Sequence, residues 1–366
     1  MKKSNRITID DIQKNPILID KVESGEVDLR TFTKDDLANL YKSNNESIPE
    51  LENIQTAINQ DLINDLGMED LRQQAKKDKK KGTILGCLTG GIVLVIWILI
   101  LHFFGPYLSF MSSDFLFGII GLSVMASGVL VMLHYSEKEE KYIAQYKSHI
   151  VKNILDSIFD NVVYIPDKGI PEEIIENAKI IEMGSYESND YIEASYNGVH
   201  FIQADINTYY DYDNGRETYF EGRWMIFDFN KSFKANIQVI PTKYKHAKKF
   251  KNFRSKDIAY KKVETEDVEF NKQFKVLAQN DYDVFYVLTS QMMERIKKLS
   301  NSISGDVIFY FNNNLLHIGI NNSINAFETD IDESIDVEME KHRILYDVNL
   351  ITLFIKELQL DMNLFK

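Results

Sequence analysis

Two long runs of apolar residues dominate the hydropathy pattern of the chain. Residues 83–104 and 115–133 contain no formally charged side chain, whereas lysines stand just outside both runs. At about 1.5 Å per residue, each run is roughly as long, as a helix, as the hydrocarbon core of a bilayer is thick. The pattern predicts a transmembrane helical hairpin with a short loop at 105–114, in which Pro106 acts as a breaker. Two buried helices of a soluble core are the alternative.

The distribution of positive charge predicts how this hairpin is oriented. The loop contains no Lys or Arg, whereas the flanking lysines are Lys76, Lys77, Lys79, Lys80 and Lys81 before the first run and Lys138, Lys141 and Lys147 after the second. Positively charged flanks stay in the cytosol, so we expect both termini there and only the loop outside. No hydrophobic signal region precedes residue 83, so we expect no cleaved secretory peptide.

Small residues recur at a spacing of four within or beside the two runs. They are Gly82, Gly86, Gly90, Ser123 and Ser127. Small side chains at this spacing let two helix backbones approach each other closely in lipid. We expect them to pack the two helices of the hairpin together, with an oligomer interface as the alternative.

Outside the hairpin the periodicity changes along the chain. Residues 1–82 predict a cytosolic helical region, because apolar side chains recur every three or four residues from Leu51 to Leu66. Residues 134–165 are expected to continue as an amphipathic helix leaving the membrane. From residue 166 onwards the period becomes two, which is typical of strands.

Asparagine-containing turns divide the carboxy-terminal part into hairpins. Asn197-Gly198 separates two alternating stretches, a second Asn-Gly stands at 214–215, and Asn312 to Asn314 separates another pair of strands. Strands are expected at 191–196, 199–202, 218–220, 224–229, 237–240, 274–277, 284–288, 307–311 and 315–320, and helices after Pro171, at 291–299 and at 348–360. Runs of strands with helices between and after them predict a mainly antiparallel α+β domain over 166–366.

Composition excludes several functional classes. With 366 residues the chain holds roughly two domains, or one domain and appendages. Its single cysteine, Cys87, excludes a disulfide framework and a cysteine-based zinc site. The net charge of −13 argues against general binding of polyanions.

No catalytic motif stands out in the sequence. Residues 211–215 resemble a calcium loop, but the glycine comes one residue early and Gly222 occupies the position of the bidentate glutamate, so a hairpin turn is favoured. The histidines are scattered, and His200 and His317 fall within predicted strands, where a packed or edge histidine is expected. We therefore predict no catalytic residue, no metal and no cofactor. An enzyme stays open only through side chains that converge in the fold.

One segment reverses the overall charge. Residues 243–262 hold nine basic side chains against Asp257, with Tyr244, Phe250 and Phe253 between them. This combination suits anionic lipid headgroups, while single-stranded nucleic acid and a solvated loop are the alternatives. The predicted lipid contacts are Lys76, Lys77, Lys79, Lys80, Lys81, Lys243, Lys245, Lys248, Lys249, Lys251, Arg254 and Lys256.

An acidic stretch follows the last predicted hairpin. Seven carboxylates lie between Glu328 and Glu340. We expect a solvated, mobile linker, and the alternatives are a site for a divalent metal and pairing with the basic segment.

Several blocks in the carboxy-terminal half occur in the same order in a known family. They are Tyr196–Phe201, Phe220–Arg223, Phe227–Phe233, Glu269–Val276 and Leu288–Arg295. On these blocks, residues from about 140 to 362 resemble the uncharacterised bacterial family called domain of unknown function 3137. The resemblance implies a bacterial protein with a paired membrane span ahead of the domain, and it supplies no catalytic residue.

Together these features predict a non-enzymatic, two-pass inner-membrane protein. Its cytosolic α+β domain is expected to bind a protein partner or the anionic inner leaflet of the cell membrane. An enzyme with an unrecognised site and a membrane-tethered nucleic-acid binder are the alternatives, and a homo-oligomer is compatible with all three.

Overall fold

The structure is a computed structural model that describes residues 60–108, 112–213, 215–229, 236–247, 260–332, 334–335 and 337–361. Within this range the chain forms two compact units. A helical unit contains the described residues up to 150 together with 329–337, and an α+β unit contains those in 151–328 and from 338 onwards. The helices expected before residue 60 lie outside the described residues.

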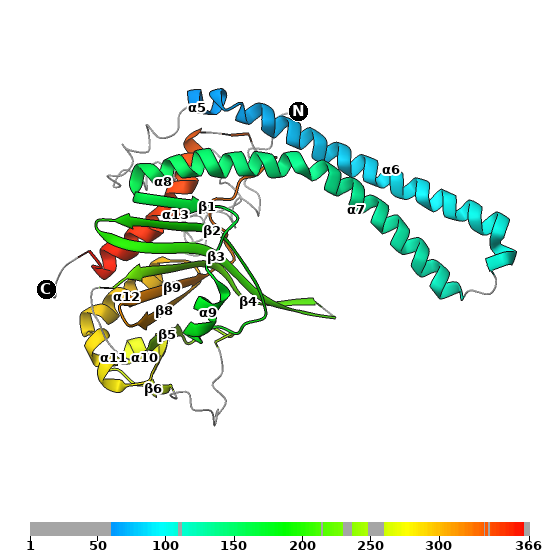
Figure 1. Cartoon of the computed structure of the whole chain (residues 1–366). Coiled ribbons are helices and arrows are strands. Elements are labelled where there is room, and N and C mark those ends of the chain that lie inside the picture. Colours follow the sequence, from blue (N-terminus) through cyan, green and yellow to red (C-terminus); the bar gives the residue numbers. More distant parts are fainter. Residues whose placement is uncertain are drawn as a thin grey trace, which may run out of the picture. The chain divides into compact units, whose positions relative to one another are not determined.

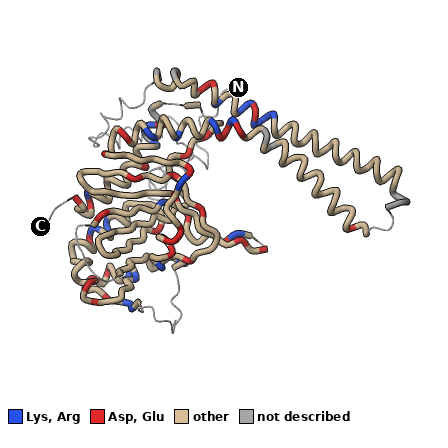
Figure 2. Tube along the Cα trace, viewed as in Figure 1, with Lys and Arg blue, Asp and Glu red and all other residues tan. Residues whose placement is uncertain are grey.

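The helical unit is built on two long helices, α6 (Met68–Leu108) and α7 (Ser113–Gln145), which are preceded by α5 (Gln60–Asp65) and followed by the π-helical turn η1 (Tyr146–Val151) (Figure 1). By length and composition, two helices are apolar enough to cross a membrane. Their apolar side chains are exposed: Phe117, Leu122 and Met125 are 70%, 74% and 71% exposed. Figure 2 shows the charged residues gathered at one end of this pair and none along most of its length.

The loop between the two helices is shorter than the sequence predicts. Helix α6 continues through Pro106 to Leu108, and α7 begins at Ser113. A proline here removes the backbone hydrogen bond to residue 102 and crowds its carbonyl, and the helix ends two residues later. Ser112 caps α7 by accepting a hydrogen bond from the Phe115 amide.

Part of the acidic stretch packs within the helical unit, so the expected mobile linker is wrong here. Ile331 is only 2% exposed, and its carbonyl oxygen accepts a 2.7 Å hydrogen bond from Nη1 of Arg72. Asp332 lies 2.9 Å from Nζ of Lys76. From Val337 onwards the chain is helical, which is eleven residues before the predicted helix start.

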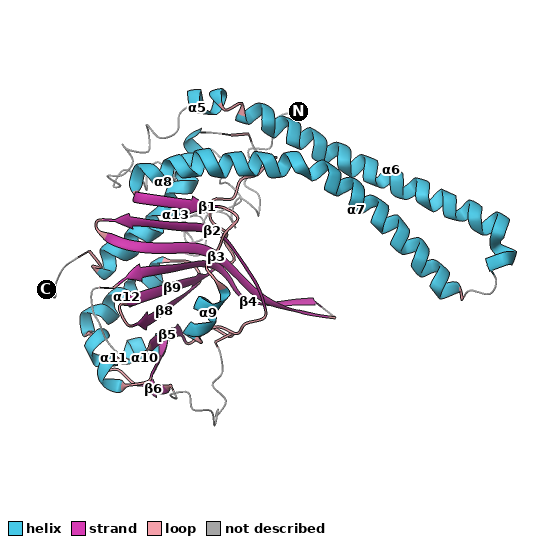
Figure 3. Cartoon of the chain, viewed as in Figure 1, coloured by secondary structure: helices cyan, strands magenta, loops and turns pink. Residues whose placement is uncertain are grey.

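The α+β unit is organised around one nine-stranded antiparallel sheet (Figure 3). Its spatial order is β1-β2-β3-β4-β9-β8-β5-β7-β6. The strands are β1 (Asp160–Ile165), β2 (Ser185–Tyr196), β3 (Val199–Tyr212), β4 (Gly215–Asp228), β5 (Ile237–Pro241), β6 (Lys261–Val263), β7 (Phe274–Ala278), β8 (Asp306–Asn312) and β9 (Leu315–Asn321). The predicted mainly antiparallel α+β class is therefore confirmed.

Helices cover the two faces of this sheet unequally. They are α8 (Lys152–Ile158), α9 (Glu172–Ala178), α10 (Val268–Gln273), α11 (Asp281–Val287), α12 (Ser290–Ser302) and α13 (Val337–Leu358). On one face, Phe354 of α13 packs against Phe227 and Phe309, and α12 joins α13 through the ion pair of Lys298 with Glu357. On the opposite face, the only helix packed over the strands in Figure 1 is the short α9.

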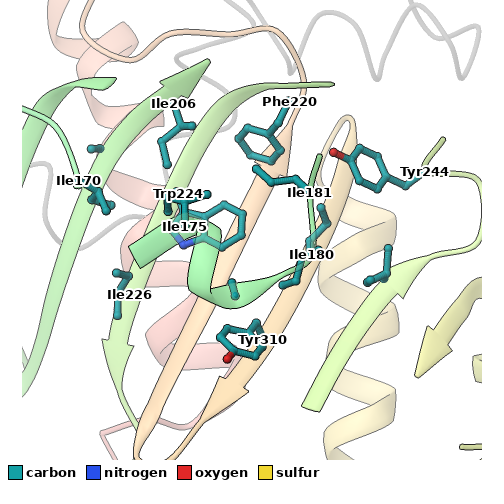
Figure 4. Close-up of a cluster of buried hydrophobic side chains, with 14 of the residues drawn as sticks. Ile170, Ile175, Ile180, Ile181, Ile206, Phe220, Trp224, Ile226, Tyr244 and Tyr310 are labelled. Atoms are coloured by element: carbon teal, nitrogen blue, oxygen red, sulfur yellow. The ribbon is translucent and has the colours of Figure 1, made fainter. Parts of the chain in front are cut away.

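The apolar cluster under α9 is the part of the core that shapes the site described below (Figure 4). Ile175 of α9 meets Trp224, Ile226 and Tyr310 of the sheet in this cluster. Gly319 makes room for the indole, because a Cβ at this position would lie 2.7 Å from Cε3 of Trp224. The β-strand alternation places Trp224 and Ile226 on this face and Arg223 and Phe227 on the other.

Two of the predicted turns are in their expected places, and Asn214 of the third lies outside the described residues. Asn197 and Gly198, with φ of 50° and 78°, connect β2 to β3, and both values suit the left-handed residues of a type I′ turn. Asn313, with φ of 54°, lies in the turn between β8 and β9. The helix expected after Pro171 is α9, which begins at Glu172.

Two predicted elements have the wrong type. Residues 284–288 were expected to form a strand but belong mostly to helix α11, because Asn280 caps the Tyr282 amide and two aspartates lie in the first turn. The amphipathic helix expected over 134–165 ends at Ile158, and residues 160–165 form the edge strand β1. The run Val162 to Ile165 is rich in β-branched and aromatic side chains, which favour a strand once a neighbouring strand is available.

Candidate functional site

A groove of about 330 Å³ lies on the sheet face that α9 covers. Its walls are mainly apolar, and they come from one helix and several strands that are distant in sequence. Its apolar side chains include Ile174 from α9, Ile202 from β3, Ile226 from β4 and Leu315 from β9. Small-molecule sites start at about this volume and are mostly apolar with a few placed polar groups.

His317 is the buried polar residue of this groove. It is 4% exposed, and its Nδ1 accepts a 3.3 Å hydrogen bond from the indole Nε1 of Trp224. An indole N–H only donates, so Nδ1 carries the lone pair and Nε2 carries the proton. Burial lowers the pKa of His317 to about 4, which keeps the ring neutral at physiological pH.

The Nε2–H of His317 has no hydrogen-bond partner among the residues that the structure describes. Leaving a buried donor unsatisfied costs roughly 1–3 kcal/mol, so native proteins rarely keep one without a reason. The ring is held on its other sides, because Tyr310 packs edge-on at a centroid distance of 5.2 Å. This N–H is enclosed by the surrounding residues and has almost no accessible surface.

The rim of the groove is polar and carries negative charge. Nε2 of His200 lies 3.3 Å from a carboxylate oxygen of Glu193, and its Nδ1 lies 3.9 Å from Asp228. Two carboxylates therefore flank one imidazole, and their charge exceeds that of the ring even when it is protonated. Asn177 and Asn312 add amide groups to the lining.

The strand pairing explains how these distant residues meet. Cross-strand pairing in antiparallel ladders places Tyr310 opposite His317 and His317 opposite Ile226. Helix α9 is held over them because Nε2 of Gln238 donates a 2.7 Å hydrogen bond to the carbonyl of Ala178, the last residue of α9. The sequence placed His200 and His317 in strands, but it gave no signal that both would line one groove.

The basic side chains predicted to contact lipid differ in their exposure and in their partners. Residues 248–259, which include Lys248, Lys249, Lys251, Arg254 and Lys256, lie outside the described residues. Lys245 is exposed, and Lys243 is exposed and lies 3.6 Å from Asp306. Tyr244, expected as an interfacial aromatic, is instead buried at 6% exposure, and its hydroxyl donates to the carbonyl of Tyr219 at 2.7 Å.

The lysines before α6's apolar part differ in their surroundings. Lys76 pairs with Asp332, Lys79 with Glu139 at 2.8 Å, and Lys81 lies 3.9 Å from Asp78. Lys77 and Lys80 are exposed. Ion pairs on a surface are weak, so the paired lysines keep part of their attraction for other anions.

The small residues predicted for helix packing lie along the contact of α6 with α7. A Cβ at Gly82 would lie 2.7 Å from Cβ of Tyr135, and one at Gly90 would lie 3.5 Å from Val124. Ser123 accepts a 2.8 Å hydrogen bond from Nε1 of Trp97 on the other helix. Gly86 approaches Gly128 through its carbonyl oxygen, and Ser127 bonds to the backbone of its own helix.

Metal binding has no geometric support in this part of the chain. Among the described residues, no group of three or more His, Cys, Asp or Glu side chains is arranged to hold a metal ion. The groove is the described place with room for a small organic ligand next to a buried polar donor.

Comparison with known proteins supports the family resemblance. A family model described as "Protein of unknown function (DUF3137)" matches residues 218–360, which include Trp224 and His317, so the resemblance is confirmed over this part of the chain. No curated protein matches. The chain is also similar to the crystal structure of the mycobacterial trehalose monomycolate transport factor A, TtfA, at 10% identity and a TM-score of 0.31, over 56% of this chain and 93% of that one.

Proposed function

We propose that the chain is a two-pass inner-membrane protein of a bacterium whose α+β domain is a non-enzymatic binding module on the cytosolic side. The observation that carries this proposal is the exposure of the apolar side chains along α6 and α7. A pair of helices that buried these residues in a soluble core would hide them from solvent, which the described residues do not do. Lipid supplies the missing apolar surroundings.

The groove supports binding over covalent catalysis. Among the described residues that line it there is no Ser, Thr, Cys or Lys side chain, so its candidate nucleophiles are limited to Asp228, Tyr310 and the two histidines. His200 and its two carboxylates have no Ser, Thr, Cys or Lys side chain there to activate. A preformed, mainly apolar pocket is sufficient to hold a small ligand.

Contact with the anionic leaflet is part of the proposal. Lys77, Lys80 and Lys245 are exposed and supply charge that anionic headgroups attract, at about 1 kcal/mol per lysine close to the surface. The lysines of the described chain that already pair with carboxylates contribute less. The strength of the contact with the leaflet also depends on residues 248–259. Only their net positive charge supports a contact there.

The topology is tested by labelling single cysteines with a membrane-impermeant maleimide. The native Cys87 is first replaced by serine, and a cysteine is then placed at Ser4, Ser112 or Asn363 in separate variants. In intact cells we expect labelling at 112 only, with the other two labelled after the membrane is permeabilised. Labelling of 4 or 363 in intact cells would overturn the proposed orientation.

The membrane insertion itself is tested by alkaline carbonate extraction of cell membranes. We expect the full chain to stay in the pellet, as integral proteins do. A matched variant with Leu94, Ile98 and Leu122 replaced by glutamate should move to the supernatant. If the unchanged chain is extracted, the helices are not inserted.

A further inference from the structure

We propose that the end of the β3–β4 hairpin is a docking surface for an arginine-bearing segment of a partner protein, whose guanidinium groups stack on Tyr210 and Tyr212 and pair with Glu217. This inference rests on the proposed role of the α+β domain as a binding module, and it names the chemistry of the partner. Three features support it: the ribbon that the hairpin forms, the exposed rings on that ribbon, and an arginine that the ribbon already holds.

The end of this hairpin is a two-stranded ribbon that no third strand joins among the residues that the structure describes. β2 pairs with β3 only as far as Tyr209, and β9 pairs with β4 only as far as Gly222. Residues 210–212 and 215–217 pair with each other alone and are exposed, and Figure 1 shows them extending past the rest of the sheet. We call residues 209–213 and 215–219 the arm. Two strands on their own are marginally stable in water, so the arm gains stability when a partner covers it.

The alternation of side chains along its strands gives the arm two faces. One face, here called the arginine face, carries Tyr209, Asp211, Arg216 and Thr218. The opposite face, here called the tyrosine face, carries Tyr210, Tyr212, Gly215 and Glu217. Figure 2 shows the charged residues near the end of the arm.

The arginine face already holds a guanidinium group. Cζ of Arg216 lies 3.6 Å from the ring centroid of Tyr209. Its Nε and Nη2 donate hydrogen bonds to the two carboxylate oxygens of Asp211, at 2.8 Å and 3.3 Å. A planar guanidinium favours this combination of a ring face and a bidentate carboxylate. The arm therefore shows within its own chain how its tyrosine and acidic side chains bind an arginine.

The tyrosine face carries the same kinds of group in an accessible form. Tyr210 and Tyr212 are each 49% exposed, and their ring centroids lie 4.6 Å apart. Hydrogen bonding to Tyr219 raises the pKa of Tyr212 to about 12, and this bond holds the Tyr212 ring by its hydroxyl. Glu217 lies directly across from Tyr210, and one of its carboxylate oxygens is 3.8 Å from Nδ1 of His246. Two exposed rings and a carboxylate thus share this face.

The tyrosine face also has room for a side chain from outside. The residue opposite Tyr212 is Gly215, and a Cβ at this position would meet no atom within 4 Å. On the arginine face, the position next to it is filled by Arg216 itself. A guanidinium that approaches the tyrosine face can therefore reach the Tyr212 ring without displacing a side chain at Gly215.

The charge of the arm favours a basic partner. Its described residues include three carboxylates, those of Asp211, Asp213 and Glu217, against the one guanidinium of Arg216, which is a net charge of −2. Among basic side chains, arginine stacks on aromatic rings and pairs with carboxylates through two bonds, whereas lysine is a compact and strongly hydrated charge. An arginine-bearing segment is therefore the partner that matches both the rings and the charge.

The docking is measured by ¹⁹F NMR on the full chain in nanodiscs of zwitterionic phosphatidylcholine. Cys87 is replaced by serine, and Thr218→Cys carries a trifluoromethyl tag on the arginine face, which leaves the two rings free. The probe is a heptapeptide that alternates glycine with arginine, and matched peptides carry lysine or citrulline in place of arginine. We expect the arginine peptide to shift the signal saturably, with a dissociation constant on the order of 1 mM. The lysine peptide should bind at least about threefold more weakly, and the neutral citrulline peptide at least about tenfold more weakly.

Variants of the tyrosine face locate the binding. Replacing both rings, with Tyr210→Leu and Tyr212→Leu, keeps apolar bulk and should weaken the arginine peptide about tenfold. The pair Tyr210→Phe and Tyr212→Phe keeps the rings and should bind within about threefold of the parent. Glu217→Gln should weaken binding about threefold. Tyr282→Leu is the matched control, since it removes a tyrosine that is 77% exposed on α11, and it should bind as the parent does.

Four results would overturn the inference. They are no saturable shift with the arginine peptide, equal binding of the three peptides, unchanged binding in the leucine pair, and an equal loss in Tyr282→Leu. A shift of the tag on adding anionic phosphatidylglycerol to the nanodiscs, with no peptide present, would make the bilayer the partner and would overturn it too. Near-ultraviolet circular dichroism establishes that each variant is folded. Failure here is distinct from failure of the proposed function, because membrane insertion and topology are scored without any peptide.

Discussion

The two faces of the sheet bury their polar side chains in different ways. On the face of α12 and α13, Arg223 is buried and its guanidinium bonds to the side chain and the carbonyl of Asp347, while Asp205 lies 4.0 Å from its Nε. On the face of α9, the buried polar group His317 has a partner on one nitrogen only. The face of α12 and α13 is thus the closed face, which encloses an ion pair, and the face of α9 is the open face, which carries the groove.

The difference follows from the length of the covering helices. Helix α13 has 22 residues and α12 has 13, whereas α9 has seven. Long helices exclude water along several strands, so a charge beneath them needs an opposite charge, which Asp347 supplies to Arg223. Even so, Nε of Arg223 and Oδ1 of Asp205 have no hydrogen-bond partner among the described residues. A helix of two turns covers only part of a face and leaves a groove at its side. The incomplete face is therefore the one with a groove.

The largest effect is expected when the closed face loses its ion pair. Asp347→Ala leaves Arg223 buried without its carboxylate and removes the acceptor of the Phe327 amide. We expect the free energy of unfolding to fall by about 3–5 kcal/mol. Urea denaturation of the detergent-solubilised chain, followed by circular dichroism, measures it. A loss below about 1 kcal/mol would mean that the guanidinium is solvated and that this face is not closed.

A smaller effect is expected when the floor of the open face is filled. Gly319→Ala puts a Cβ 2.7 Å from Cε3 of Trp224. The indole must move, and overpacking of this kind typically costs about 1–3 kcal/mol. The same denaturation experiment measures the loss, and Gly118→Ala, with no atom within 4 Å, is the control. Equal stability of the two variants would contradict the tight packing of Trp224 on β9.

The closed face should also make stability depend on pH. Burial raises the pKa of Asp205 to about 8, against the lowering effect of Arg223 and with Asp190 and Asp347 adding to the rise. The folded state then holds a proton between about pH 4 and 8 that the unfolded state has released, so stability falls as pH rises through this window. The slope reaches about 1.4 kcal/mol per pH unit at most. Asp205→Asn should flatten this profile, and an unchanged slope would assign it to other groups.

The smallest effect is expected at the surface of the closed face. Lys298 of α12 pairs with Glu357 of α13 at 2.7 Å, and the Lys298 side chain is exposed. Lys298→Ala should cost between about 0.2 and 1 kcal/mol, because water screens such a pair. This variant calibrates the Asp347 result. A cost equal to that of Asp347→Ala would remove the distinction between buried and exposed pairs.

Features set by neighbouring residues could be predicted from the sequence. The Asn197-Gly198 turn and the alternation around it fix a hairpin locally, as do the asparagines at 312–314. The charge-free runs predict two long helices in the same way. The error at 284–288 has a local cause too, since the cap at Asn280 and the aspartates that follow outweigh a short run of strand-forming residues.

The groove depends on contacts that no local pattern contains. Trp224 and His317 are 93 residues apart, and their hydrogen bond exists only because β4 and β9 pair in one register. The partner that Arg72 finds at Ile331 is 259 residues away. A histidine within a strand has the same sequence signature whether it is packed, at an edge or open to a ligand. Its role follows from which helix covers the face, and α9 is too short to cover it fully.

The length of helix α6 determines how far its end moves when the helix tilts. Its 41 residues form one unbroken rod about 60 Å long, which is about twice the ~30 Å of hydrocarbon that it is proposed to cross. Residues 68–82, roughly 22 Å of helix, then stand outside the lipid on the side of Arg72 and its bond to Ile331. A change of roughly 10° in tilt, well within the range that such helices adopt, would displace the outer end by about 5 Å. A change of tilt that matches the helix to a thinner or thicker bilayer would therefore move its base.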